Sequence, residues 1–304
     1  MHFHLTSSTR TTAQQKMLAQ LDRYHSLSAD DDTVHFLKSV FRFLPLEGRV
    51  QLADDVDSCD DDDQLRQLAR HLDTALLRPM VALFPRPGME DFIEDSVIRR
   101  ACLQRDNNQC VVTKFWDPDF DSRPPNAITA DLEALSIIPF GMGMDFQEDE
   151  RIPHAQVWSC LHRYFPDIRG LLPHSTEAAD PYNNMMMLAN TFPNFGNTFL
   201  RSHIPEFVIL SSRNHQYPVL NRFLLAAHAA VGNILHTTGH GKLIEKTLEH
   251  LRGSGGYALA EDGRTDVEEL LSVTRLALLA AKPQPPPACK EKHPHHAGST
   301  DTYG

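Results

Sequence analysis

The chain lacks the features that mark membrane, secreted and zinc-binding proteins. In 304 residues no apolar run reaches the ~20 residues that a membrane helix needs. Residues 1–24 are polar and do not contain the apolar stretch of a signal peptide. The five cysteines are odd in number and have no Cys-x-x-Cys spacing, which argues against a disulfide framework or a zinc site. We therefore expect a cytoplasmic protein of a reducing compartment.

Positive charge is also scarce. The chain has 29 Lys and Arg residues against 40 Asp and Glu residues, which gives a net charge of −11. Proteins that bind nucleic acid draw much of their affinity from Lys and Arg contacts to phosphate, so this balance argues against a nucleic-acid partner, although it leaves a local basic patch open. The hydrophobic fraction of 41% is ordinary for a globular protein.

The first third of the sequence has an acidic, helical pattern. We predict helices at residues 12–24 and from Asp31-Asp32 onward, the second with an apolar stripe of Val34, Leu37, Phe41 and Leu44. Four aspartates at residues 60–63 precede a further helix at 64–77. We expect these aspartates to cap that helix, because carboxylates stabilise a helix N-terminus, and not to bind metal.

The middle third mixes helical and strand patterns. Helices are predicted at 89–105, 158–165 and 183–188. The β-branched segment 110–113 and the apolar segment 134–138 predict two strands, separated by a turn-rich stretch at 117–126. Together the two strands should form an irregular hairpin.

The last third returns to helices with clear end signals. Pro218 suits a first helical turn, and apolar residues then recur at helical spacing as far as Gly239. A second helix should end at Gly253, and a capping box of Thr265 with Glu268 predicts a third at 270–280. The Pro- and His-rich residues 282–304 predict a disordered tail.

These patterns predict an α+β fold that is mainly helical, with a small β-hairpin-plus-helix core embedded in helices. We divide the chain into an N-terminal helical region at 1–88, a core with C-terminal helices at 89–281, and the tail at 282–304. The first two regions should form one compact unit, because no long linker separates them.

Five stretches of the middle region together resemble the fungal HNH-endonuclease-like proteins. They are Arg105-Asp106, residues 110–113 (CVVT), 132–140 (LEALSIIPF), 158–166 (WSCLHRYFP) and 183–196. Any one of these would be a weak signal, but their combination and order are specific. The resemblance covers residues 90–279 and implies a two-strand-plus-helix metal-nuclease fold.

The same resemblance shows what this chain has lost. In HNH nucleases a strand histidine acts as general base, and a helix histidine helps to hold a divalent cation. The corresponding positions here are Ser136 and Phe192, and only the asparagine, Asn183, remains. Serine has no basic nitrogen and phenylalanine cannot bind a metal. We therefore expect a degenerate branch with no nuclease activity, no metal and no cofactor.

The residues around the lost site suggest a different chemistry. Methionines and phenylalanines interleaved with amides describe a cavity for an apolar ligand with one or two oxygens. Its candidate lining residues are Phe192, Met186, Met187, Asn190, Phe195, Phe199 and Trp158. The alternative is that the methionines simply pack the core.

The leading hypothesis is a metal-independent cyclase, a pericyclase of the Diels–Alderase type. Its small hydrophobic substrate would be a terpenoid or polyketide intermediate of fungal natural-product biosynthesis. Ser136 and Asn183 would donate hydrogen bonds, and Glu133 would be either an acid/base group or structural. The alternative is a catalytically dead pseudo-nuclease that acts as a binding or regulatory protein. Both hypotheses are compatible with a homo-oligomer.

Overall fold

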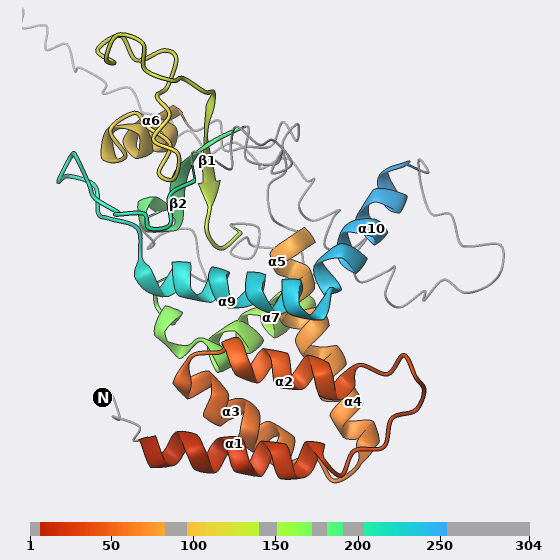
Figure 1. The fold of residues 1–304 in the computed structure, drawn as a ribbon. Helices are drawn as coiled ribbons and strands as arrows, with labels where there is room; N and C mark the ends of the chain where they lie inside the picture. The colour runs from red at the N-terminus through yellow and green to blue at the C-terminus, as the bar shows by residue number, and fades with distance from the viewer. Residues whose placement is uncertain (1–6, 83–95, 140–150, 172–180, 191–203, 254–304) are drawn as a thin grey trace, which may run out of the picture.

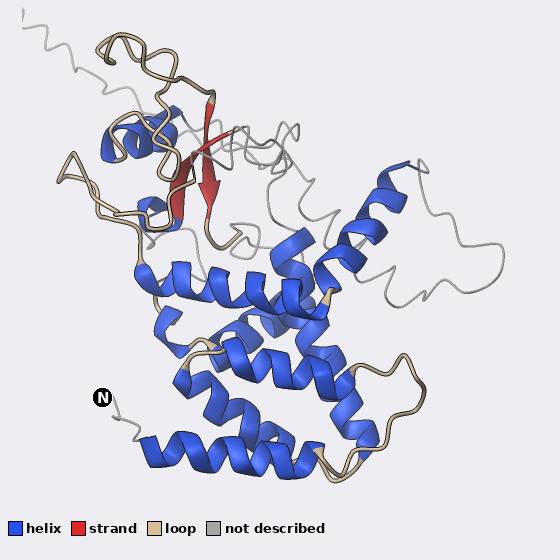
Figure 2. Ribbon diagram, in the orientation of Figure 1, coloured by secondary structure: helices blue, strands red, loops and turns tan. Residues whose placement is uncertain are grey.

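Helices make up most of the computed structural model, which describes residues 7–82, 96–139, 151–171, 181–190 and 204–253. The α-helices are α1 (Ser7–Leu21), α2 (Thr33–Phe43), α3 (Leu46–Asp57), α4 (Asp62–Leu72), α5 (Arg78–Ala82), α6 (Ser96–Arg105), α7 (Arg151–Tyr164), α9 (Arg222–Thr238) and α10 (His240–Gly253). Shorter elements are the π-helix η1 (Asp73–Leu77), the 3-10 helices η4 (Pro166–Ile168) and η5 (Pro181–Asn184), and the strands β1 (Leu132–Ser136) and β2 (Met185–Ala189). The mainly helical fold with a small antiparallel sheet confirms the expected α+β class (Figures 1 and 2).

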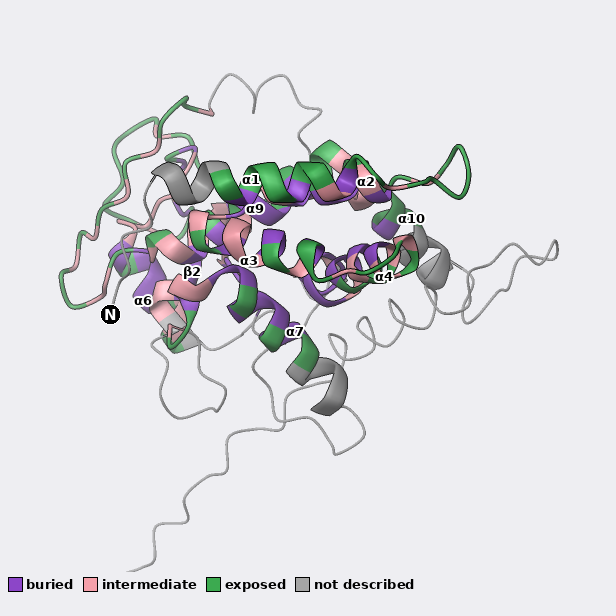
Figure 3. Ribbon diagram, turned by 90° about the horizontal axis from the view of Figure 1, so that it is seen from below, coloured by how far each residue is buried: buried purple, intermediate pink, exposed green. Residues whose placement is uncertain are grey.

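The helices other than α6 share one continuous apolar core. α1 packs on α3, α2 packs on α9, and α7 lies against α3 and η1. Of the stripe predicted for α2, Leu37 and Leu44 (the residue just after the helix) are buried, whereas Val34 and Phe41 are half-buried and pack against the core. Phe36 and Val40 complete the inward face, so the helical spacing located this face only in part. Figure 3 shows buried and exposed positions alternating along α1, α3 and α7. Among the described helices, none combines the length and apolar character needed to cross a membrane.

One helix of this body, α3, was missed by the sequence patterns. Its first turn contains Gly48, which lowers helix propensity and weakens the signal. The structure gives a reason for the glycine, because a Cβ atom there would lie 2.2 Å from the backbone oxygen of Tyr164. Gly48 therefore allows α3 and α7 to approach closely.

The predicted helix ends can be checked from their caps. Asp61 accepts a hydrogen bond from the backbone N–H of Gln64 (2.8 Å), which confirms capping by the aspartate run. Gly239 adopts φ 76° after α9, as expected of a C-terminal glycine. The expectation for Pro218 was wrong, since α9 begins at Arg222 with Asn221 as its cap. The asparagine side chain supplies a cap that proline cannot.

The sheet differs from the predicted hairpin. β1 pairs antiparallel with β2, with Leu132 opposite Ala189 and Ser136 opposite Met185. Residues 110–113 belong to a tight turn and not to a strand, because Cys110 N–H bonds to Phe115 O and Lys114 N–H returns to Cys110 O. The expected helix at 183–188 is instead η5 followed by β2. Methionine is a good helix former, but here pairing with a distant strand overrides local propensity.

The sheet is attached to the helical body on one side and covered by α6 on another (Figure 1). Nδ1 of His228, on α9, lies 2.6 Å from the carbonyl oxygen of Ile137, just beyond β1. Asn221 N–H bonds to Asn183 O (3.2 Å). Ile137 and Ile138 belong to the same core as α2 and α7. The helix predicted at 270–280 and the tail at 282–304 lie outside the described residues.

Candidate functional site

The asparagine next to the predicted one fixes the end of the strand pair. Asn184 is 1% exposed, and its Oδ1 accepts from Ile138 N–H (2.9 Å) while its Nδ2 donates to Ile138 O (2.7 Å). Its own carbonyl accepts from Ile137 N–H (2.7 Å). The side chain therefore imitates a further residue of the ladder and holds the chain that follows β1.

Ser136 lies at the last position of β1, opposite Met185. The serine is 3% exposed, and Met185 is buried in a second, smaller apolar cluster with Met187 and Cys102. A hydroxyl at this depth does not meet solvent. The position that the HNH resemblance predicts for the base is therefore internal.

The three methionines do not line one cavity. Met185 and Met187 belong to the small cluster, whereas Met186 packs against the main core. This split follows from the alternation of side chains along a strand. Such burial agrees with the alternative interpretation, in which the methionines pack the core.

Beside the sheet, Arg105 and Asp106 form a buried ion pair. Arg105 is 1% exposed, and its Nε and Nη2 donate to the two carboxylate oxygens of Asp106, both at 2.7 Å. The guanidinium also donates to the carbonyl oxygens of Tyr182 (2.5 Å) and Met185 (2.7 Å). Asp106 in turn accepts from Met187 N–H (3.2 Å). Each charge of this cluster is paired with the other. Its hydrogen bonds to backbone groups join the end of α6 to η5 and β2.

The other predicted catalytic residues are Glu133, on β1, and Asn183, in η5. Glu133 is opposite Leu188 and half-buried, and burial together with the nearby charge of Asp131 raises the pKa of its carboxyl. Three positions along a strand put Glu133 and Ser136 on opposite faces. Asn183 is also half-buried, and its carbonyl oxygen accepts from the N–H that precedes α9.

The predicted binding residues are dispersed as well. Trp158 is buried in the main core on α7, with its ring 5.3 Å from that of His162. Asn190 is exposed, and its N–H closes the strand ladder on Asp131 O (2.8 Å). Phe192, Phe195 and Phe199 lie outside the described residues. The described candidates therefore do not form a single apolar site.

A cavity of about 280 Å³ lies on the outer side of the Arg105–Asp106 pair. One wall is the turn after α6, and the other is the segment at 209–220. Polar side chains include Asn107, Gln109, Lys114 and Arg213. The sequence analysis missed this site. The only local signal was the Asn107-Asn108 pair, a residue type that tolerates the left-handed conformation found there (φ 61° and 54°).

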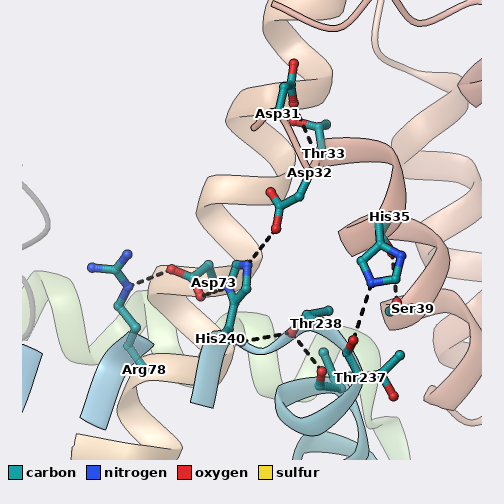
Figure 4. A network of polar contacts seen from close by, with 11 residues as sticks. Asp31, Asp32, Thr33, His35, Ser39, Asp73, Arg78, Thr237, Thr238 and His240 are labelled. Carbon is teal, nitrogen blue, oxygen red and sulfur yellow. Dashed lines mark hydrogen bonds and ion pairs between the residues drawn. The ribbon is translucent and has the colours of Figure 1, made fainter. Parts of the chain in front are cut away.

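A second polar cluster links distant parts of the helical body (Figure 4). His240, at the start of α10, has Nδ1 2.8 Å from Asp73 and Nε2 3.0 Å from Asp32. Asp73 also accepts from Arg78 Nε (2.6 Å). The ring of His240 stacks on Phe36 with centroids 4.8 Å apart. The cluster thus connects α10 to η1 and to the start of α2.

Hydrogen bonds and charge pairing in this cluster shift the pKa values of His240 and Asp73. Burial disfavours the imidazolium, but hydrogen bonds to Asp73 and Asp32 outweigh it and raise the pKa of His240. Burial likewise opposes ionisation of Asp73, but the hydrogen bond with His240 and the charge of Arg78 lower its pKa. Both ring nitrogens of His240 are engaged, so it has none left to act as a base. We interpret the cluster as structural.

Within the described ranges, no group of three His, Cys, Asp or Glu side chains is placed to hold a metal ion. Comparisons with protein-family models, with curated proteins and with solved structures found no match for this chain. The functional argument therefore rests on the residues themselves.

Proposed function

We propose that the chain is a catalytically inactive binding protein that keeps a nuclease-like strand pair as a structural element. The observation that supports this proposal is the pair of hydrogen bonds between the Asn184 side chain and the backbone of Ile138. Oδ1 and Nδ2 of Asn184 hold the N–H and the carbonyl oxygen of Ile138, which is a structural use of the side chain at the end of β1. The asparagine of the HNH resemblance was assigned to Asn183, yet the neighbouring Asn184 is the one that contacts the end of β1.

The strand position of the lost base supports the same proposal. Ser136 is buried beside Met185, and it has no nitrogen that could accept a proton from water. Phosphodiester hydrolysis at neutral pH needs a base and, in this class of site, a cation. A buried serine between packed side chains serves neither purpose.

The cyclase hypothesis remains a prediction, and it is our second candidate function. Its aromatic lining residues, Phe192, Phe195 and Phe199, lie outside the described residues. Of its described members, Met187 and Trp158 are buried in two different apolar clusters. The binding interpretation needs none of these residues in one pocket, so we place it first.

The test combines a cleavage assay with a ligand screen. The purified chain is incubated with supercoiled DNA and with Mg²⁺ or Mn²⁺, and we expect no nicking above a protein-free control. In parallel, lipophilic polyenes and small polar molecules are screened by thermal stabilisation, followed by product analysis. Cation-dependent nicking would contradict the proposal.

A matched variant separates binding from turnover. Ser136→Ala removes the hydroxyl with little change of volume, so the fold should be kept. We expect ligand binding to remain within about twofold of the parent chain, since a difference of 0.4 kcal/mol or less is expected where no ligand contact is lost. Conversion of a polyene to a ring product, abolished by Ser136→Ala, would replace our proposal with the cyclase.

A further inference from the structure

The cavity beside Arg105 combines fixed positive charge with exposed apolar side chains. It is lined by four charged residues, of which Arg105 and Asp106 neutralise each other. Lys114 and Arg213 are both exposed and form no ion pair with another described residue. Two cations that no carboxylate of the described residues neutralises therefore line one cavity in a chain whose net charge is −11.

Both cations are carried by segments that hydrogen bonds hold in place. Lys114 adopts φ 61°, and its carbonyl oxygen accepts from Gln109 Nε2 (3.1 Å). Arg213 N–H donates to Arg105 O (2.8 Å), directly at the buried ion pair. Ser212, one residue earlier, donates to the carbonyl oxygens of Asn214 and Tyr217 (2.6 and 2.8 Å). A cationic pair on fixed backbone lowers the cost of ordering when an anion binds.

The segment that carries Arg213 also presents apolar side chains that are unusually open to solvent. Ile209 is 83% exposed and Val219 is 43% exposed, and both line the cavity. Phe207, two residues before Ile209, is 79% exposed. Large apolar side chains left in water near charged groups suit a ligand that is itself amphipathic.

We propose that this cavity binds a small amphipathic organic anion. The anionic head would lie between Lys114 and Arg213, and the apolar body would cover Ile209 and Val219. The volume of about 280 Å³ suits a medium-chain carboxylate or a molecule of similar size. This inference gives the proposed binding function a ligand class, and it rests on the cavity and not on the strand pair.

Octanoate is the probe, with the full chain in low-salt buffer and isothermal titration as the measurement. Arg213→Gln and Lys114→Gln should each weaken octanoate binding by roughly tenfold, because each removes a charge-assisted contact. Lys242→Gln, which removes an exposed cation on α10, is the matched control and should leave the affinity unchanged. Ile209→Ser should weaken octanoate binding, since it removes apolar contact area.

Two further probes separate the parts of the ligand. Octanol keeps the chain without the charge, and inorganic phosphate keeps a charge without the chain, so both should bind at least tenfold more weakly than octanoate. Octanol binding equal to octanoate, octanoate binding unchanged in Arg213→Gln and Lys114→Gln, or absence of octanoate binding would each overturn the proposal. The nicking assay tests the inactive-nuclease proposal separately, so either can fail alone.

Discussion

Two regions of this protein are held together in different ways. The helical body, formed by α1–α5, α7, α9 and α10, shares one large apolar core. The strand unit, residues 96–139 and 181–190, has a small apolar cluster and depends on buried polar groups such as Arg105 and Asn184. Apolar burial tolerates small shifts, whereas paired charges and amides require one geometry. The strand unit should therefore be the more precisely fixed region and the more easily broken one.

The largest effect is expected in the strand unit, from Arg105→Met. Methionine fills similar space but leaves the Asp106 carboxylate without its cation and two carbonyl oxygens without their guanidinium donor. Breaking a buried ion pair by removing one partner costs about 3–5 kcal/mol. Urea denaturation measures the loss, and Arg100→Met, an exposed change on the same helix, should cost less than about 0.5 kcal/mol. Equal losses for the two variants would contradict the distinction between the regions.

The matching change in the helical body is Leu37→Ala. Leu37 is fully buried in the main core, and truncation there should cost about 2–5 kcal/mol. Hydrogen exchange sharpens the comparison: Leu37→Ala should lower protection throughout the body, while Arg105→Met should lower it first in β1 and β2. Leu27→Ala, at a 72% exposed position, is the control and should have little effect. Loss of protection in the same amides for both core variants would show that the two regions unfold as one.

A smaller, pH-dependent effect is expected from His240→Gln. Because the folded pKa of His240 is raised, its contribution is complete below the unfolded value of about 6.5 and is lost as pH rises through the folded pKa. We expect the variant to lose about 1–2 kcal/mol near pH 5.5, after allowance for the exposed Asp32 partner. At pH 9 the loss should be smaller. Urea midpoints at both pH values measure it, and a loss that does not change with pH would contradict the charged pairing.

The cluster of His240 and Asp73 should also contribute less stability at acid pH. The lowered pKa of Asp73 means that its contribution is present above the unfolded pKa of about 4 and is lost as pH falls through the folded value. The cluster should therefore stabilise the helical body most between pH values of about 4 and about 6.5, the unfolded pKa values of Asp73 and His240. His35→Gln provides a control, because this exposed imidazole lies 3.3 Å from the carbonyl oxygen of Thr237 and pairs with no carboxylate of the described residues.

The two regions also differed in how far the sequence predicted them. In the body, apolar faces follow from residues three and four apart, so Leu37 and the end of α9 at Gly239 were assigned correctly, although α3 and the start of α9 were not. In the strand unit the deciding contacts are remote. Arg105 binds carbonyl oxygens 77 and 80 residues away, and the pairing of Ser136 with Met185 converts an expected helix into a strand. Local patterns carry no information about such pairings.

The candidate site shows the same limit. Asn183 was chosen by its position in a motif, but which of two adjacent asparagines turns inward depends on the register of β2. The cavity between Lys114 and Arg213 joins segments about a hundred residues apart. The sequence alone does show that Ser136 and Phe192, the positions that the HNH resemblance assigns to histidine, are not histidines, because this concerns residue identity and not placement.

The smallest predicted effect concerns local structure in the body. Asp61→Ala removes the side-chain acceptor for Gln64 N–H at the start of α4, and losing such a cap costs about 1 kcal/mol. Asp60→Ala is the control, because Asp60 takes part through its backbone N–H, which bonds to Gln64 Oε1 and survives the substitution. Urea denaturation should therefore separate the two variants by about 1 kcal/mol, with the m-value unchanged. Equal effects would mean that the aspartate run acts through its summed charge on the helix dipole, and that even this local feature is not set by one hydrogen bond.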